Sequence, residues 1–341
     1  MTSITYRDAG VDIEAGTRAV ELMKQAVQAT YGPEVLAGIG AFGGLFDVSA
    51  LKAMQSPVLV ASTDGVGTKT KIAAALGRFD TIGFDIVNHC VNDILVQGAR
   101  PLFFLDYIAA SRLRPERVAE VVRGIAAACQ EVGCALLGGE TAEMPGVYEP
   151  NEFDLVGTII GVVDRHQIID GQAITSGDPV IGLASTGLHT NGYSLARRVF
   201  QGWDLQPVVP ELGQSLGEAL LRPHRTYLTA IRRLWAAQVT IKGMAHITGG
   251  GLIDNPPRML PAGTAIHLHR ESWPIPPIFQ LIQQVGHISA EEMARTFNLG
   301  LGMLLIIQPH QLDQALNGLG DHAWVVGQII PDDGGSRVKT N

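Results

Sequence analysis

Short apolar runs alternate with amphipathic segments along the first half of the chain. Apolar runs of strand length predict strands at residues 58–61, 102–108, 135–137 and 154–163. Apolar residues that recur every three or four positions predict a helix at 81–97 and another from Pro115 to about Gly133. Residues 1–39 form a partly helical lead-in, which ends in a glycine-rich segment at 38–44. Strands that alternate with helices are typical of a layered α/β fold.

A second α/β set follows a break in this pattern. Between residues 164 and 178 the apolar density falls and Asp-Gly and Ser-Gly-Asp turns appear. We therefore predict an N-terminal domain at 1–170 and a C-terminal domain at 171–341. The elements predicted beyond the break are strands at 180–184, 265–268 and 303–307, helices after Asn191 and at 224–237, 278–285 and 290–297, and a final helix and strand.

Composition narrows the function classes. The 341 residues are 46% apolar and 17% charged, which indicates a folded globular protein. A formal net charge of -8 argues against a general nucleic-acid or acidic-membrane binder. No apolar run approaches the roughly 18 residues of a membrane span, and the three cysteines form no CxxC pair. We expect a cytoplasmic protein with buried thiols. Glycine is the anomaly, because 40 of the 341 residues are glycine, about 12% against an average usage of about 7%.

Residues 63–69, TDGVGTK, place a carboxylate, glycines, hydroxyls and an ammonium directly after a strand. Bare backbone amides can point at phosphate oxygens, Lys69 can neutralise one, and Asp64 can hold Mg²⁺. The GxxxxGK spacing of a Walker A loop is absent. The alternative is a tight turn with a solvent-exposed lysine.

The predicted helix at 81–97 carries a polar stripe. Its members lie at helical spacing and are Asp85, Asn88, His89, Asn92 and Asp93. A solvated helix face usually carries Lys and Glu. Short Asp, Asn and His side chains are better suited to bind a metal or a sugar. Asp93 is the strongest candidate, Asn92 follows and His89 is weaker. The alternative is a half-buried face that makes internal hydrogen bonds.

Other glycine-rich segments offer further polar groups. Residues 138–145 are predicted to be a loop, in which Glu140 and Glu143 could bind Mg²⁺ or act as acid or base, or form structural salt bridges. In the second half, residues 185–194, with His189 and Asn191, predict an anion pocket at a helix N-terminus. The segment at 246–251 and the turn at 297–302 are similar, although each alone could be ordinary turn chemistry.

Six ordered motifs together resemble the aminoimidazole ribonucleotide synthetase (phosphoribosylformylglycinamidine cyclo-ligase, PurM) family. They are TDGVGTK at 63–69, VNDILVQGA at 91–99, LLGGETAEMPG at 136–146, HTNGYSL at 189–195, HITGGG at 246–251 and RTFNLGLGM at 295–303. The opening YRDAGVDI at 6–13 is also similar to the start of that family. The resemblance therefore covers nearly the whole chain.

The resemblance implies a two-domain PurM-like ATP-binding fold, in which the domain at 1–170 binds ATP and Mg²⁺ and dimerises, and the domain at 171–341 completes the substrate site. It also implies a homodimer, in which sheets of the N-terminal domains form a shared barrel, and the use of ATP and Mg²⁺. The family converts formylglycinamidine ribonucleotide and ATP to aminoimidazole ribonucleotide, ADP and phosphate.

Carried over by motif, the resemblance assigns roles to residues of this chain. The implied metal ligands are Asp64, Asp93 and, less surely, Glu140. The implied nucleotide contacts are Lys24, Asp64, Gly65, Gly67, Thr68, Lys69, Asn92 and Asp93. The implied substrate contacts are Gly139, Glu140, Glu143, His189, Asn191, Thr248 and Gly250. The implied catalytic groups are Asp93, His189, His246 and Glu140. Selenophosphate synthetases have an acidic metal ligand at the position of His246, so the histidine here favours substrate contact or proton transfer.

Two alternatives stay open. The chain could be another enzyme of the same superfamily, such as a thiamine-phosphate kinase or a selenophosphate synthetase. The latter normally needs a reactive Cys near its N-terminus, and none precedes Cys90 here. The chain could also be a non-catalytic nucleotide-binding subunit, which the joint presence of Asp64, Lys69, Asp93 and Glu140 disfavours.

Overall fold

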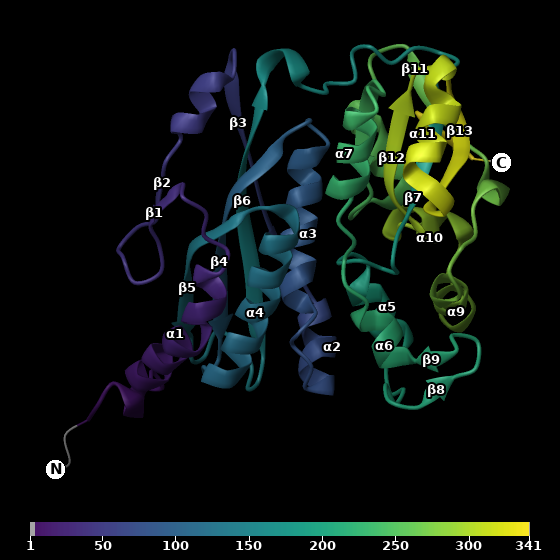
Figure 1. The fold of residues 1–341 in the computed structure, drawn as a ribbon. Helices are drawn as coiled ribbons and strands as arrows, with labels where there is room; N and C mark the ends of the chain where they lie inside the picture. Colours follow the sequence, from purple (N-terminus) through teal and green to yellow (C-terminus); the bar gives the residue numbers. More distant parts are fainter. Residues whose placement is uncertain (1–3, 341) are drawn as a thin grey trace. The chain divides into compact units, whose positions relative to one another are not determined.

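The computed structural model describes residues 4–340 and divides the chain into two compact units. The first unit contains the described residues up to Ile94 together with Ala99–His166, and the second contains Leu95–Gly98 and the chain from Gln167 onward. Both units combine sheets with helices (Figure 1). The N-terminal and C-terminal roles assigned to 1–170 and 171–341 remain predictions.

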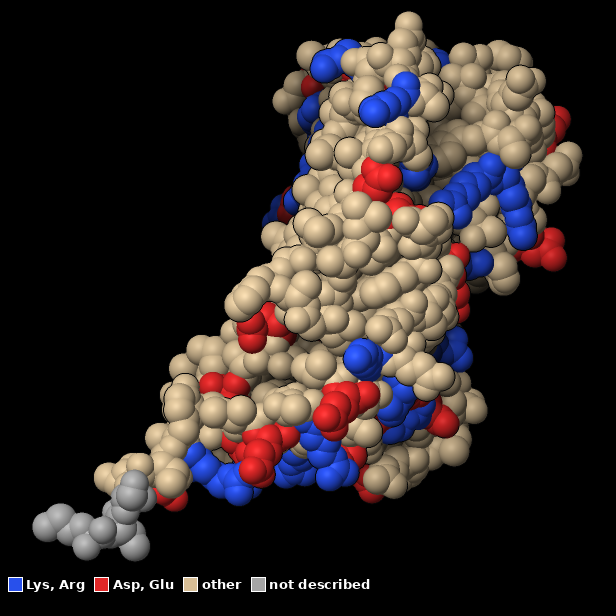
Figure 2. All heavy atoms as spheres, turned by 60° about the vertical axis from the view of Figure 1, so that its left-hand side comes forward, with Lys and Arg blue, Asp and Glu red and all other residues tan. Residues whose placement is uncertain are grey.

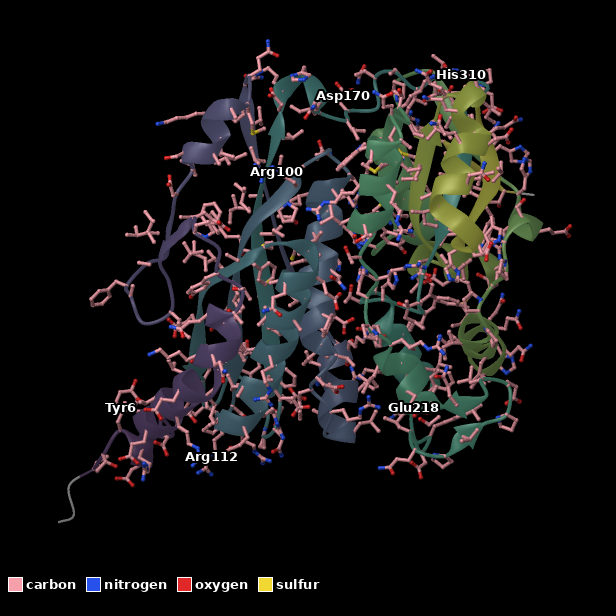
Figure 3. All side chains as sticks on the ribbon, viewed as in Figure 1. Tyr6, Arg100, Arg112, Asp170, Glu218 and His310 are labelled. Atoms are coloured by element: carbon pink, nitrogen blue, oxygen red, sulfur yellow. The ribbon has the colours of Figure 1, made fainter. Side chains whose placement is uncertain are left out.

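The first unit is built on a four-stranded mixed sheet in the order β3-β6-β4-β5. Only β4 and β5 pair in parallel, whereas β6 is antiparallel to both β3 and β4. In Figure 3, Arg100 marks the start of β4, and Arg112 follows shortly after its end at Ala110. The elements are α1 (Ile13–Gln28), β1 (Val35–Ala37), β2 (Leu45–Phe46), β3 (Pro57–Gly65), α2 (Lys69–Leu76), α3 (Ile82–Leu95), β4 (Arg100–Ala110), α4 (Pro115–Val132), β5 (Ala135–Glu143) and β6 (Phe153–Asp164).

Helices α3 and α4 cover one face of this sheet (Figure 1). Along β6, buried and half-buried residues alternate from Phe153 to Gly161, as expected for a strand with one covered face. The two helices approach closely where Gly83 of α3 meets Gly124 of α4. A Cβ on Gly83 would clash with the backbone of α4, and one on Gly124 would clash with the carbonyl of Asp80, just before α3. The apolar sides of both helices thereby form the core of the unit.

Two predicted element boundaries in this unit are wrong. Strand β3 continues through Thr63, Asp64 and Gly65, which pair with β6, and β5 continues to Glu143 through the predicted loop at 138–145. The cause is the same in both places. Ladder hydrogen bonds to a neighbouring strand keep glycine-rich backbone extended, and local sequence does not reveal that neighbour.

The second unit contains a six-stranded sheet in the order β10-β12-β7-β13-β11-β14. All pairs are antiparallel except β11 with β14, and all seven residues of β12 are buried. The strands are β7 (Pro179–Ala184), β8 (Val208–Val209), β9 (Gln214–Ser215), β10 (Ile241–His246), β11 (Thr264–Leu268), β12 (Leu301–Ile307), β13 (Ala323–Pro331) and β14 (Val338–Thr340). The helices are α5 (Tyr193–Val199), α6 (Leu216–Leu221), α7 (Leu228–Ala236), α8 (Gly251–Asp254), α9 (Pro277–Gly286), α10 (Ala290–Thr296) and α11 (Leu312–Leu319).

The helix predicted at 224–237 is shorter than expected, because α7 begins only at Leu228. Residues 224–227 lead into it, and the side chains of His224 and Tyr227 are buried there. The prediction of buried thiols is confirmed for Cys90, Cys129 and Cys134. Among the described helices, none combines the length and the apolar character that crossing a membrane requires.

Candidate active-site residues

Three polar side chains of the first unit meet near the end of β3. His89 Nε2 lies 3.0 Å from Asp64 Oδ2 and 3.7 Å from Asp93 Oδ2. His89 and Asp93 are one turn apart on α3, so both face Asp64 on the neighbouring strand. Asp93 Oδ2 also accepts a hydrogen bond from Ser62 Oγ at 3.0 Å. The two predicted metal ligands, Asp64 and Asp93, thus lie close together, because both contact the same nitrogen of His89.

Opposite charge shifts the pKa values of His89 and Asp64 apart. Burial by itself would lower the pKa of His89 and raise that of Asp64. Their mutual hydrogen bond and charge attraction outweigh burial, so the pKa of His89 is raised and that of Asp64 is lowered. The contact between His89 and Asp64 therefore favours the charged forms of both side chains. Asp64 and Asp93 together provide the hard oxygen donors that fit Mg²⁺.

Lys69 forms a buried ion pair with Asp85 of α3. Its Nζ lies 2.8 Å from Asp85 Oδ1, and both side chains are 0% exposed. Burial lowers the pKa of Lys69 and the charge of Asp85 opposes that shift. The alternative of a solvent-exposed lysine is therefore wrong, because the ammonium is buried against Asp85 of α3. The predicted phosphate contact of Lys69 stays a prediction.

The polar stripe of α3 faces inward, as in the alternative of a face that makes internal hydrogen bonds. Asp85 and Asn92 are fully buried and Asn88 and His89 nearly so, while the side chain of Asp93 keeps 25% of its surface exposed. Of the glycine motif, Gly65 lies in β3 and Gly67 has φ +68°, a backbone conformation that favours glycine. Thr68 then occupies the N-cap position of α2.

A cavity of about 590 Å³ opens between α1, β4, β5 and the glycine-rich segment at 38–44. Gly139 and Glu140 of β5 line it beside Asp106 of β4. Burial raises the pKa of Asp106 to about 7. Its carboxylate lies against Gly139, where a Cβ would clash with it. Lys24, the predicted nucleotide contact on α1, is exposed and is not among the residues that line this cavity.

Glu143 is held by backbone groups. Its Oε1 accepts a hydrogen bond from the amide of Leu113 at 2.7 Å, and its Oε2 accepts one from the amide of Asp12. Both oxygens thus tie other segments to β5 through backbone amides, whereas the structural alternative in the sequence analysis was a salt bridge. The substrate contact of Glu143 stays a prediction.

Three loops of the second unit converge around His189. This residue has φ +62° and is fully buried, and its Nε2 accepts a hydrogen bond from the Thr186 amide at 3.2 Å. Asn298, from the turn at 297–302, accepts a hydrogen bond from Ser185 Oγ at 2.9 Å and donates one to the carbonyl of Gly187 at 2.8 Å. The anion-pocket loop at 185–194 is therefore fixed by the turn that precedes β12.

The loop after β10 lies beside the same residues. Asn255 donates hydrogen bonds to the carbonyls of Thr248, Gly249 and Gly251, which fixes the loop's path. Asn191 Oδ1 is close enough to touch a Cβ added at Gly249. The structure thus brings Asn191 together with the loop that carries Thr248 and Gly250.

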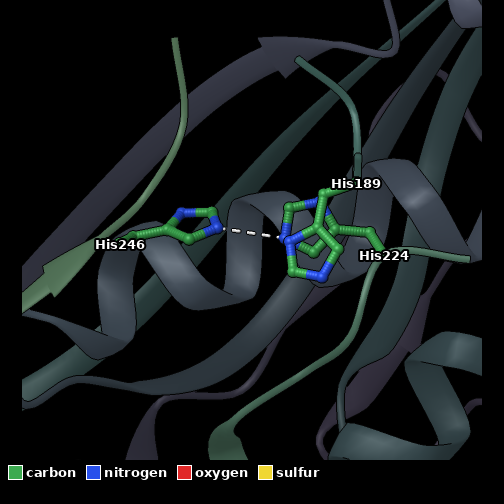
Figure 4. A group of neighbouring side chains, drawn as sticks. All are labelled: His189, His224 and His246. Carbon is green, nitrogen blue, oxygen red and sulfur yellow. Dashed lines mark hydrogen bonds between the residues drawn. The ribbon is translucent and has the colours of Figure 1, made fainter. Parts of the chain in front are cut away.

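His224 was missed by the sequence analysis. Its Nε2 lies 3.0 Å from His246 Nε2, and its ring stacks on His189 with centroids 4.0 Å apart (Figure 4). In the sequence it stood at the start of a predicted amphipathic helix, with no motif around it. Pro223 gave no signal for it either, because a proline restricts the backbone of the residue before it, here Arg222.

Comparison with protein-family models matches both halves of the chain. Residues 47–163 match the N-terminal domain of AIR synthase related proteins, and residues 175–339 match the C-terminal domain. Phosphoribosylformylglycinamidine cyclo-ligase of Syntrophotalea carbinolica is 53% identical over 332 residues, covering 96% of this chain and 94% of that protein. The cyclo-ligase of Geotalea uraniireducens is 50% identical over 340 residues, covering 98% and 97%.

Solved structures of lower identity share the fold. A hydrogenase maturation protein HypE in complex with ATP superposes with a TM-score of 0.70 at 18% identity, covering 98% of this chain and 93% of that one. A thiamine-monophosphate kinase from Stenotrophomonas maltophilia gives 0.65 at 21% identity, covering 94% and 96%. Since the curated cyclo-ligases match at about half identity along nearly their whole length, the chain belongs to the phosphoribosylformylglycinamidine cyclo-ligase (AIR synthase) family.

Proposed function

We propose that this chain converts formylglycinamidine ribonucleotide and ATP to aminoimidazole ribonucleotide, ADP and phosphate. Its similarity to cyclo-ligases over nearly the full length is the observation that carries the proposal. The enzyme is an ATP-dependent ligase of de novo purine biosynthesis, a function that fits the expected cytoplasmic location.

The chemistry explains why ATP is needed. A carbonyl oxygen is a poor leaving group, so the formyl oxygen first takes the terminal phosphoryl group of ATP. An amidine nitrogen then attacks the formyl carbon, a C–N bond forms, the C–O bond breaks and phosphate leaves. The attacking nitrogen loses one proton. The protein must orient these groups, neutralise phosphate charge and accept that proton.

In this proposal the first unit handles the nucleotide. Asp64 and Asp93 would hold Mg²⁺, which when bound neutralises charge on the nucleotide phosphates. Glu140 lies on β5, three strands away from Asp64 of β3, and its register with Tyr107 places it on the other face of the sheet, so it would not share that ion. The meeting of Asp64 and Asp93 at His89 supports this assignment. The cavity beside the glycine-rich segment at 38–44 is large enough for part of a nucleotide, and Gly139 and Glu140 line it.

The second unit would contact the substrate. Asn191, Thr248 and Gly250 lie on loops that meet beside His189. His189 and His246 are buried imidazoles and would serve substrate contact or proton transfer. Glycine-rich loops at strand ends offer backbone amides to anionic groups, which reconciles phosphate binding with a net negative chain.

A homodimer is the proposed assembly. The face of the first sheet opposite α3 and α4 carries half-buried and exposed apolar residues, among them Leu59 at 64% exposure, Phe103 and Ile160. Figure 2, which brings forward the side of Figure 1 that carries β1, β2 and β3, shows a broad uncharged area in its middle, with charged side chains gathered below it, near the start of α1, and others above it. Such a face suits burial against a second copy. Sedimentation should give the mass of two chains.

Phosphate release tests the function. The purified protein should release phosphate from ATP only when formylglycinamidine ribonucleotide is present, and it should form aminoimidazole ribonucleotide without any phosphorylated end product. Transfer of phosphate onto a stable product would instead indicate a kinase, and ATP binding without turnover would indicate a nucleotide-binding subunit. Asp93→Asn should lower turnover by orders of magnitude with folding intact, whereas Asp170→Asn, an exposed control labelled in Figure 3, should not.

A further inference from the structure

Two buried histidines of the second unit face each other through the same ring atom. The Nε2 atoms of His224 and His246 lie 3.0 Å apart, and the residues are 1% and 6% exposed. His246 ends β10, whereas His224 lies in the segment before α7. Figure 4 shows the two rings joined through these nitrogens.

This contact requires exactly one proton between the two nitrogens. Two lone pairs at 3.0 Å would repel each other, and so would two N–H groups. With one proton, one ring donates from Nε2 and the other accepts. The two neutral rings must then be in opposite tautomers, so that each ring fixes the protonation of the other.

The surroundings of His224 allow both arrangements. Its Nδ1 lies 3.3 Å from Thr190 Oγ1, and a hydroxyl group can either donate to that nitrogen or accept from it. On one side the ring is stacked on His189, with an interplanar angle of 22°. Buried packing and two polar contacts therefore hold His224 in place whichever ring carries the shared proton.

The same three histidines could be considered a metal site, since one ring nitrogen from each lies within 4.8 Å of the others. Two features favour hydrogen bonding instead. The rings of His189 and His224 are nearly parallel, so their in-plane lone pairs do not converge on one point. His189 Nε2 already accepts a hydrogen bond from the Thr186 amide, which in the neutral ring leaves the proton on Nδ1.

We propose that His224 is a positioning residue that fixes the orientation and tautomer of His246 and shares its proton during ring closure. The inference rests on the proposed function, in which the attacking nitrogen loses a proton. When His246 gains that proton on Nδ1, the N–H bond of the substrate breaks and a new Nδ1–H bond forms. The proton on His246 Nε2 passes to His224 Nε2, and the positive charge moves to His224. No heavy atom has to move.

Substitution of His224 separates this function from simple packing. His224→Phe keeps a flat ring against His189 but removes both nitrogens, and His224→Gln keeps one polar group near the position of Nε2. His267→Phe is the matched control, because His267 of β11 also packs against another histidine ring, His269, at 4.6 Å. We expect His224→Phe to lower kcat by about 10- to 100-fold, below the full effect of a general base, with KM changed less than about threefold. His224→Gln should recover part of the loss, and the control should match the wild type.

Nitrogen-15 NMR of histidine-labelled protein gives a readout that does not depend on activity. The His246 resonances, assigned with His246→Gln, should report a single tautomer in the wild type and a mixture in His224→Phe. Unchanged His246 resonances together with wild-type kcat in His224→Phe would overturn the proposal. The proposal would also be overturned if the protein bound one equivalent of zinc and this binding required all three histidines. If His224→Phe does not fold, the same two measurements on His224→Gln decide. A wild type without turnover would refute the proposed function, while the NMR result would still test the coupling of the two rings.

Discussion

The ion pair between Lys69 and Asp85 tests whether the TDGVGTK motif binds phosphate through its lysine or supports the fold with it. The two charged atoms lie 2.8 Å apart and neither side chain is exposed. Lys69→Met keeps a side chain of similar length and removes the ammonium. The carboxylate of Asp85 would then stay buried with its countercharge removed.

The expected loss of stability is large. Removing one partner of a buried ion pair costs about 3–5 kcal/mol, because the remaining charge is desolvated and uncompensated. With a urea m-value of about 2–3 kcal/mol/M, the unfolding midpoint should fall by roughly 1–2 M. Lys71→Met is the matched control, because Lys71 pairs with Glu152 at the surface, where the side chains are 41% and 33% exposed. An exposed pair of this kind contributes about 1 kcal/mol or less.

Urea unfolding followed by circular dichroism measures the difference, with ATP-dependent turnover measured in parallel. Lys69→Met/Asp85→Leu should recover much of the lost stability, because no unpaired charge remains. The reasoning is refuted if Lys69→Met unfolds at the wild-type urea concentration but no longer binds ATP. That result would show that Lys69 contributes to phosphate binding rather than to the stability of the fold.

Three further variants test other contacts. The pKa of His89 is raised above 6.5, so its contribution to stability is complete below pH 6.5 and is lost as the pH rises through the higher, folded-state pKa. In the absence of metal, the Tm of the wild type should therefore fall over that pH range, and the Tm of His89→Gln should not. The same pH dependence in both proteins would contradict the pairing of His89 with Asp64. Gly302→Ala should lower stability by about 1–3 kcal/mol in chemical denaturation, since the added Cβ meets Tyr227 Oη; wild-type stability would show that this contact relaxes. Glu143→Gln should lower Tm, because its carboxylate accepts two backbone amides, with KM for ATP unchanged; a selective rise in that KM would instead indicate nucleotide contact.

The order of elements could be predicted because it depends on local periodicity. The polar stripe on α3 is an example, since the spacing of Asp85, His89 and Asp93 is enough to place them on one side of a helix. What lies opposite that stripe could not be predicted. Asp64 and Lys69 reach it through strand pairing and side-chain burial, and neither can be seen in a single sequence. For the same reason His224 gave no signal, because its partner His246 follows 22 residues later on another element.

The glycine excess has two structural causes. Glycine-rich runs predict backbone that approaches a ligand, and Gly67, with its positive φ, fits a tight turn. Other glycines instead make room for the protein's own side chains. A Cβ on Gly139 would clash with Asp106, one on Gly157 with Phe104, and one on Gly302 with Tyr227. Each of these glycines lies within a strand. Because a glycine that admits a neighbouring side chain and one that admits a phosphate look the same in sequence, only the residue facing each glycine distinguishes packing from binding.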